Sequence, residues 1–243
     1  MIALRGVHRS FGGRPILQGV DLALGRGALT FLVGRSGAGK SVLSRCAVGL
    51  LAIDRGAIEI DGVEITALSE AALNRLRCEV PYVVQGSALI DWLSLEENIE
   101  VPLTRALRLP RAEARERARA ALSDVGLDGQ QTRLPQELSA GDRKLLAIAR
   151  ALALAPKAIF YDEPTTGLDP HAARRVDELI QRHAAHGATS VVVSHDLDSI
   201  RRIAGRVALL DEGRIAFSGS ASDFFAAEAQ HPAVHRFFHQ SEG

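Results

Sequence analysis

Cysteine is scarce in this chain, whose 243 residues contain only Cys46 and Cys78. Cys46 lies in an apolar helical pattern, and neither cysteine has the spacing of metal ligands. This scarcity argues against a disulfide framework and a cysteine metal site. It favours two reduced thiols in a cytosolic protein.

Long apolar runs and an excess of charge of one sign are also missing. No stretch approaches eighteen uncharged apolar residues, and the N-terminal residues lack the apolar core of a signal peptide. We therefore expect no membrane-spanning helix, so a partner must supply the membrane part of any membrane process. Because 29 Lys and Arg balance 29 Asp and Glu, no broad nucleic-acid-binding face is indicated, although a local basic patch stays open.

What the chain does contain is a glycine-rich octet between a predicted strand at 29–33 and a predicted buried helix at 41–51. The octet consists of Gly34, Arg35, Ser36, Gly37, Ala38, Gly39, Lys40 and Ser41. Its pattern and its strand–loop–helix context are those of a phosphate-binding loop. Glycines let backbone N–H groups surround phosphate oxygens, and a helix N-terminus adds partial positive charge. Lys40 is predicted to reach the outer phosphates of a nucleoside triphosphate, and the Ser41 hydroxyl to coordinate Mg²⁺.

Strand patterns alternate with helical patterns along much of the chain. The early pattern predicts strands at 2–7, 20–24, 29–33, 57–60 and 81–85, and a helix at 68–78. From about 89 to 155 the pattern is helical. The late pattern predicts strands at 158–161, 189–193 and 207–210, between helices at 171–185, 197–203 and 222–229. This alternation predicts an α/β fold with a mainly parallel sheet covered on both faces.

Two carboxylates follow the predicted strand at 158–161, namely Asp162 and Glu163. Ligands collect at the carboxyl ends of parallel strands, so we expect both acids beside the phosphate-binding loop. One acid can hold Mg²⁺, directly or through water, and its neighbour can polarise the attacking water. A simple acid pair in a loop or at a helix start is the alternative, which the neighbouring loop makes the weaker one.

Two further predicted strands end in polar residues. Gln85 ends the strand at 81–85 and could sense Mg²⁺ or the attacking water. His195 follows the strand at 189–193 and could contact a γ-phosphate. Each signal is weak alone, since a lone histidine is more commonly a satisfied surface residue.

Taken together, these residues resemble the ATP-binding-cassette (ABC) ATPases. The resemblance covers essentially the whole chain and rests on the order of 34–41, Gln85, 138–142, Asp162 with Glu163, 167–169 and His195. It implies a P-loop NTPase with a RecA-like core, an N-terminal antiparallel β lobe and an inserted helical lobe at about 86–155. Residues 1–243 would form a single ABC ATPase domain with a C-terminal tail at about 230–243.

The resemblance also implies ATP and Mg²⁺ as cofactors. It places Phe11 on the adenine, where the family usually has tyrosine, and a plain core residue is the alternative for this ring. Val42 extends the phosphate-binding loop where threonine is commoner. The residues implied to hold the metal are Ser41, Gln85 and Asp162. The residues implied to be catalytic are Glu163, His195 and Gln85.

A head-to-tail homodimer is implied as well. Ser139 and Gly141, at the start of a helix at 140–153, would face the γ-phosphate bound by the other subunit. Asp169 would cross the interface. Most relatives read Leu-Ser-Gly-Gly and then Gln, Glu or Met, whereas this chain has Ala140 and Asp142. A Cβ and a carboxylate near phosphate predict weak ATP-driven closure.

Four local features resemble the Mla-type ATPases, which power phospholipid transport between membranes together with MCE-domain proteins. They are Val42 and the segments 85–98, 161–170 and 231–238. The resemblance implies an integral-membrane permease and an MCE-domain protein as partners, no nucleic acid, and a peripheral place on the cytoplasmic face of the inner membrane.

Other functions stay open. Another ABC exporter or importer, for example one for lipoprotein release, is the nearest alternative. A soluble cassette ATPase acting on DNA or ribosomes usually has tandem cassettes, long insertions or coiled coils, which do not fit this chain. A P-loop kinase of another family would not explain 138–142 or Asp169.

Two expectations concern partner surfaces. Trp92, the sole tryptophan, is predicted to be exposed and to line the groove that receives a permease helix, with a packed lobe residue as the alternative. In the tail, Phe237 and Phe238 are predicted to supply apolar contact at the dimer interface.

Overall fold

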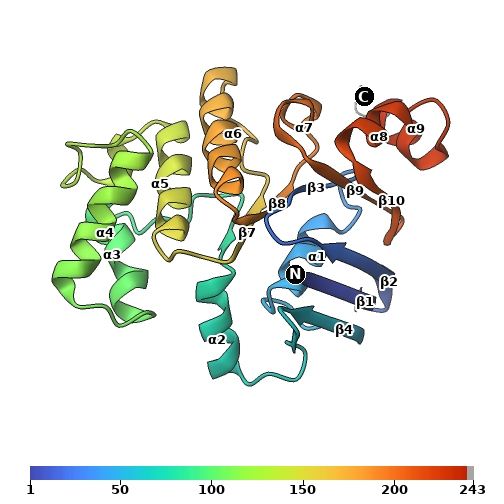
Figure 1. Cartoon of the computed structure of the whole chain (residues 1–243), viewed down its shortest axis with the longest axis horizontal. Helices are drawn as coiled ribbons and strands as arrows, with labels where there is room; N and C mark the ends of the chain where they lie inside the picture. Colours follow the sequence, from blue (N-terminus) through green and yellow to red (C-terminus); the bar gives the residue numbers. More distant parts are fainter. Residues whose placement is uncertain (240–243) are drawn as a thin grey trace.

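The computed structural model describes residues 1–239, which form two β-sheets with helices around them (Figure 1). The smaller sheet is antiparallel, with the order β2-β1-β4-β5. Its strands are β1 (Ile2–Phe11), β2 (Arg14–Leu24), β4 (Arg55–Ile60) and β5 (Val63–Glu64). The larger sheet has the order β10-β9-β3-β8-β7-β6. Its strands are β3 (Leu29–Val33), β6 (Tyr82–Val83), β7 (Ala158–Asp162), β8 (Thr189–Val193), β9 (Arg206–Asp211) and β10 (Arg214–Ser220).

The central strands of the larger sheet, β3, β7 and β8, are buried on both faces. Neighbouring strands from β9 to β6 run parallel, and β10 pairs antiparallel with β9 at one edge. Along β3, Phe31 and Val33 belong to one apolar cluster and Leu32 belongs to another. Successive side chains of a strand point to opposite faces, so a strand that is apolar throughout needs cover on both sides. The expected α/β fold with a mainly parallel sheet is thereby confirmed.

Helices supply this cover (Figure 1). Helix α1 (Lys40–Ala47) packs against β7 and β8, and its buried side chains share an apolar cluster with the smaller sheet. Helices α6 (Pro170–Ala185) and α7 (Leu197–Ile203) lie on the opposite face. Helices α8 (Ala221–Ala226) and α9 (Pro232–His239) pack against β10.

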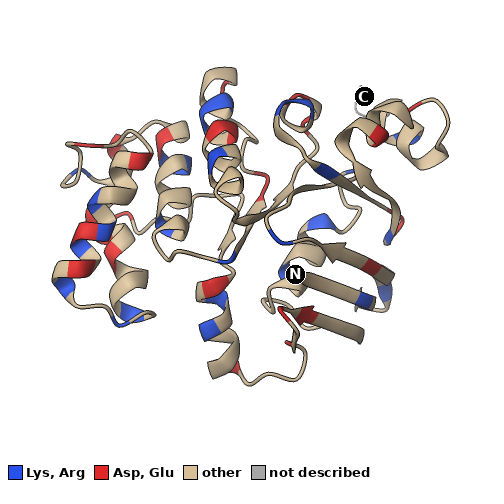
Figure 2. Ribbon diagram, in the orientation of Figure 1, with Lys and Arg blue, Asp and Glu red and all other residues tan. Residues whose placement is uncertain are grey.

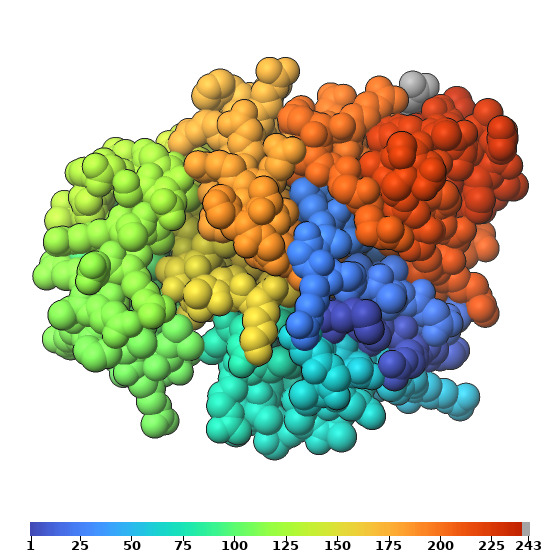
Figure 3. Space-filling view, viewed as in Figure 1, coloured from blue at the N-terminus to red at the C-terminus, as the bar shows by residue number. Residues whose placement is uncertain are grey.

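Helices α3 (Leu95–Arg105), α4 (Arg111–Asp124) and α5 (Ala140–Leu152) pack together at one end of the molecule (Figure 3). A short 3₁₀ turn, η1 (Pro135–Glu137), leads into α5, whereas α2 (Glu70–Glu79) lies outside this group. The α3 helix starts at a capping box, in which Ser94 and Glu97 bond to each other's backbone N–H. Charges of both signs alternate along α4 (Figure 2), and Arg115 and Arg119 both contact the buried Glu96. Three arginines of α4 are therefore locally compensated, since Arg117 also pairs with Glu113.

Several boundaries differ from the sequence-based prediction. The β2 strand begins at Arg14 rather than at 20, and the strand predicted at 81–85 comprises only Tyr82–Val83. Residues 89–94, predicted to be helical, precede α3, which begins at Leu95. The β10 strand (Arg214–Ser220) was not predicted at all, because Ser218, Gly219 and Ser220 suggest a turn rather than a strand. Part of the predicted tail, residues 240–243, lies outside the described residues.

The tail phenylalanines, predicted to supply apolar contact at the dimer interface, are buried inside the chain instead. Phe237 is 3% exposed and Phe238 is 7% exposed within this single chain. Their rings lie 5.9 and 5.4 Å from the ring of Phe224 on α8. Both rings are thus part of the chain's own core, because α9 turns its apolar face inward, and they are not free to cover a partner. Within residues 1–239, no helix is both long and apolar enough to cross a membrane.

Candidate nucleotide-binding site

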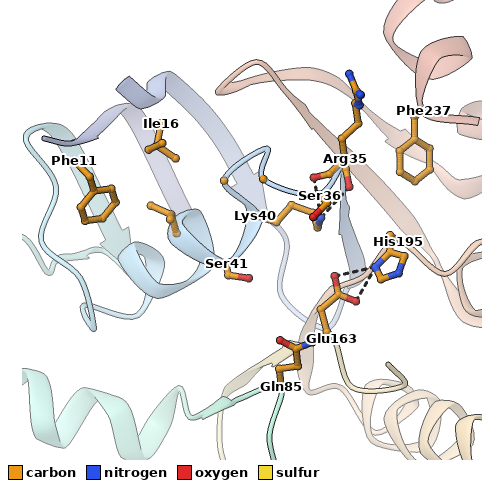
Figure 4. Close-up of a pocket in the computed structure, with 14 residues that line it drawn as sticks. Phe11, Ile16, Arg35, Ser36, Lys40, Ser41, Gln85, Glu163, His195 and Phe237 are labelled. Atoms are coloured by element: carbon orange, nitrogen blue, oxygen red, sulfur yellow. Dashed lines mark hydrogen bonds and ion pairs between the residues drawn. The ribbon is translucent and has the colours of Figure 1, made fainter. Parts of the chain in front are cut away.

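An open cavity of about 720 Å³ lies at the carboxyl-terminal edge of the larger sheet (Figure 4). The strands β3, β7 and β8 end here, and the segments that follow them supply most of the lining. The lining residues are Phe11, Ile16, Gly34, Arg35, Ser36, Gly37, Gly39, Lys40, Ser41, Val42, Gln85, Glu163, His195 and Phe237. Residues from six distant parts of the sequence therefore meet in one place.

The glycine-rich loop forms one wall of this cavity. Gly34 has a φ of 154°, and a Cβ at this position would lie 2.3 Å from the Leu210 carbonyl oxygen, so only glycine fits. The Lys40 Nζ donates to the carbonyl oxygens of Gly34 and Arg35 at 2.8 and 3.1 Å. Burial lowers the pKa of Lys40, while the nearby Glu163 and Asp162 raise it. The Lys40 ammonium is thus held against the backbone carbonyls at the start of the loop.

Asp162 lies beneath the loop and is 2% exposed. Its two carboxylate oxygens accept from the Ser41 hydroxyl at 2.8 Å and from the Tyr82 hydroxyl at 2.6 Å. Burial, and the bond to this carboxylate, raise the pKa of Tyr82, so the phenol remains a donor. The Arg45 guanidinium is 3.5 Å away. Two hydroxyls and a more distant cation therefore satisfy a buried carboxylate beside the cavity.

Glu163 follows directly and has a left-handed backbone, with a φ of 47°. Such a conformation costs a non-glycine residue about 1–3 kcal/mol, and a bond from the Glu163 N–H to the Val193 carbonyl oxygen at 2.9 Å holds it in place. The turned backbone directs the carboxylate into the cavity (Figure 4). There it contacts the His195 Nδ1 at 3.0–3.1 Å, and it also accepts from the Thr166 hydroxyl at 2.8 Å.

Phe11, from the smaller sheet, and Gln85, from the segment after β6, both line the cavity (Figure 4). Gln85 is exposed and lies two residues beyond the end of β6. The buried Lys144 Nζ donates to the carbonyl oxygens of Val84 and Gln85 at 3.2 and 2.5 Å and so fixes the backbone here. Burial lowers the pKa of this lysine. Phe11 is 44% exposed, and the Arg9 guanidinium lies 4.7 Å from its ring centroid.

Some residues predicted for the site do not line the cavity. Ala38 belongs to the loop but is not a lining residue, and Asp162 reaches the cavity only through its bond to Ser41. Ser139 and Gly141 lie at the start of α5, and Asp169 caps α6 through the N–H groups of its first turn. Those backbone bonds lower the pKa of Asp169. None of these last three residues contributes to the cavity of its own chain.

Sequence reasoning missed four residues of this region. Ile16 and Phe237 line the cavity, Tyr82 donates to Asp162, and Lys144 holds the Gln85 backbone. Tyr82 could have been found from the sequence, because it lies at the start of a predicted buried strand and a buried phenol needs a polar partner. The other three contacts join segments far apart in the sequence, so local pattern could not reveal them.

Comparison with known proteins agrees with this geometry. The sequence profile of the ABC transporter family matches residues 17–166. A methionine import ATP-binding protein, MetN of Brucella abortus, is 39% identical over 93% of this chain, which spans 61% of that relative's length. A glutamine transport ATP-binding protein, GlnQ of Geobacillus stearothermophilus, is 34% identical over 93% of both chains.

Solved structures are similar as well. The ATP-binding cassette MJ0796, in a dimeric post-hydrolysis state bound to ADP and Pi, has a TM-score of 0.82 and 30% identity, covering 91% of this chain and 99% of that one. The cbiO1 protein of Clostridium perfringens, part of the transporter complex cbiONQ, has a TM-score of 0.84 and 26% identity, covering 100% and 98%. This chain belongs to the ABC transporter family. It is an ATP-binding ATPase of the ABC type.

Proposed function

We propose that the chain is the ATP-hydrolysing motor of a membrane transporter, that it works as a head-to-tail homodimer bound to a permease, and that the transported substrate is a phospholipid. The observation that carries the catalytic part is the meeting of Lys40, Ser41, Glu163 and His195 in one cavity. The cavity combines an anion-binding loop with a carboxylate base, which is what hydrolysis of a phosphoanhydride needs.

Each lining residue has a proposed role. The N–H groups of residues 34–41 and the Lys40 ammonium bind the phosphates, and Phe11 stacks on the adenine. Glu163 accepts a proton from water as the water oxygen attacks the γ-phosphorus and the bond to the bridging oxygen of ADP breaks. His195, bonded to Glu163, contacts the γ-phosphate and orients this carboxylate.

The donor set suits Mg²⁺. Ser41 and Asp162 present oxygen atoms 2.8 Å apart, and the Gln85 side chain lines the same cavity. Hard oxygen donors of this kind are what Mg²⁺ prefers. When bound, the ion would neutralise charge that develops on the phosphates. Ser41 and Asp162, with Gln85, are the residues that would hold it.

A second copy of the chain completes the site. Ser139, Gly141 and Asp169 lie away from the cavity of their own chain, on α5 and at the cap of α6. In a head-to-tail pair the α5 N-terminus of one copy would face the γ-phosphate held by the other. The dimeric structure of the similar cassette MJ0796 supports this arrangement.

The permease is proposed to dock on the helical lobe, at about 86–155, beside Gln85. A second cavity of about 300 Å³ lies here, mostly apolar, and its lining includes Val84, Ile90, Pro102 and Arg150. Trp92 is 81% exposed, as expected, but does not line this cavity. We propose that Trp92 flanks a permease helix seated in the cavity, since exposed aromatic residues commonly anchor interfaces. Docking of this kind would place the chain on the cytoplasmic face of the inner membrane.

Two substrate classes have support. The Mla-like segments 85–98, 161–170 and 231–238 favour phospholipid transport with an MCE-domain partner. The names of the methionine and glutamine relatives favour amino acid import. We propose the lipid, because these three segments contain Gln85, the loop that joins β7 to α6, and most of α9.

One experiment tests the whole proposal. The tagged Glu163→Gln chain is purified in mild detergent with ATP, co-purifying proteins are identified, and bound lipids are measured by mass spectrometry. A Lys40→Ala chain, expected to lose ATP binding, is the matched control. An integral-membrane subunit with bound phospholipid is expected. A membrane subunit that binds methionine or glutamine and no phospholipid would assign the amino acid class, and absence of any membrane subunit would overturn the motor role.

A further inference from the structure

The start of α5 contains a polar cluster made of Ser139, Asp142 and Arg175. Ser139 caps the helix, because its Oγ accepts from the Asp142 N–H at 3.1 Å. The same hydroxyl donates to the Asp142 Oδ2 at 2.7 Å. The other carboxylate oxygen, Oδ1, accepts from the Arg175 guanidinium of α6 at 2.9 Å.

Close packing fixes this cluster in place. A Cβ at Gly141 would lie 2.7 Å from the Ala172 Cβ, so α5 and α6 approach as nearly as a glycine permits. Arg175 lies one turn beyond Ala172 on α6, which brings its guanidinium to Asp142. The Asp142–Arg175 pair therefore joins the two helices that carry Ser139 and Asp169.

The hydrogen bond has a consequence for phosphate binding. A serine hydroxyl has a single proton, and here that proton is donated to a carboxylate. Towards any other group the oxygen can then present only lone pairs. A phosphate anion needs a donor, so it competes with Asp142 for the Ser139 proton, and the Asp142 charge also repels it unless Arg175 balances that charge.

We propose that Asp142 and Arg175 are positioning residues that set the ATP concentration at which two copies of the chain close around nucleotide. Asp142 withholds the Ser139 proton from the γ-phosphate of the partner copy, and Arg175 limits the repulsion. This inference rests on the proposed head-to-tail dimer, and it adds Arg175 to the expectation that the Asp142 carboxylate weakens ATP-driven closure.

The test follows ATP-dependent dimerisation of the Glu163→Gln chain by sedimentation velocity. Asp142→Asn keeps the size of the side chain, and its amide can donate to the Ser139 Oγ and free the hydroxyl proton. It should lower the ATP concentration for half-maximal dimer by about fivefold, the difference between a hydrogen bond to a charged and to a neutral acceptor. Arg175→Met should raise that concentration several-fold, but not when Asp142→Asn is also present.

Arg174→Met is the matched control, since Arg174 is the preceding residue on α6 and is exposed. It should leave the ATP concentration unchanged. A merely structural role predicts that Asp142→Asn and Arg175→Met both lower Tm and shift dimerisation in the same direction. Shifts of equal sign, or an Arg175→Met chain that behaves like Arg174→Met, would overturn the inference. If the Glu163→Gln chain forms no dimer at any ATP concentration, the shared-site proposal itself fails, and this inference fails with it.

Discussion

Replacing Phe238 with alanine should strongly destabilise the single chain. Phe238 is 7% exposed, and its ring lies 5.4 Å from Phe224 and 5.7 Å from Phe225, measured between centroids. Removing a buried phenylalanine ring from a core costs about 3–5 kcal/mol, because the lost burial and the remaining cavity add. For a chain of this size the loss lowers Tm by about 6–20 °C.

Thermal unfolding of the nucleotide-free protein measures this effect, followed by circular dichroism at low protein concentration. Phe11→Ala is the matched control, since the same truncation at a ring that is 44% exposed should cost less than about 1 kcal/mol. An unchanged Tm for Phe238→Ala, together with weaker ATP-dependent dimerisation, would refute the internal packing of α9. It would restore the tail phenylalanines to a dimer interface.

Three further changes probe the site. Glu163→Gln should bind ATP and hydrolyse it at least about 100-fold more slowly, because an amide cannot accept the proton of water, and a near-normal turnover rate would exclude Glu163 as the base. Trp92→Ala should weaken permease binding about tenfold or more in a pull-down titration and leave basal ATPase activity unchanged; loss of folded protein instead would make Trp92 a packing residue. Lys144→Met should raise the free Mg²⁺ concentration for half-maximal ATPase activity several-fold, by releasing the Gln85 backbone, whereas Lys157→Met, at a surface pair with Glu79, should not. Equal responses of the two lysine variants would show that Lys144 does not position Gln85.

The elements that carry the phosphate-binding loop could be predicted because their signals are local. The octet from Gly34 to Ser41, the apolar strand before it and the helix after it occupy one short stretch of sequence. The same holds for β7, whose apolar run ends in Asp162 and Glu163. Strand β10 was missed because its second half, Ser218 to Ser220, has the composition of a turn and is held in a strand by pairing with β9.

Burial of the tail could not be predicted from its pattern. An amphipathic helix such as α9 has the same spacing of apolar residues whether it covers its own core or a partner. The rings of α9 are buried because Phe224 and Phe225, on the separate helix α8, lie against them. The ion pair of Asp142 could not be predicted either, because its partner Arg175 is 33 residues away in the sequence.

The buried charges around Asp162 explain why this carboxylate remains suited to a cation. Two buried lysines, Lys40 and Lys144, lie near enough to interact with it electrostatically, yet both ammonium groups donate to backbone carbonyls instead. The Asp162 carboxylate instead accepts from the neutral hydroxyls of Ser41 and Tyr82, and the Arg45 guanidinium lies 3.5 Å from it. A lysine bonded directly to Asp162 would neutralise it and compete with Mg²⁺. The carbonyls of Gly34 and Val84 thus hold the two buried ammonium groups, which leaves the Asp162 oxygens to the hydroxyls, to Arg45 and to the proposed Mg²⁺.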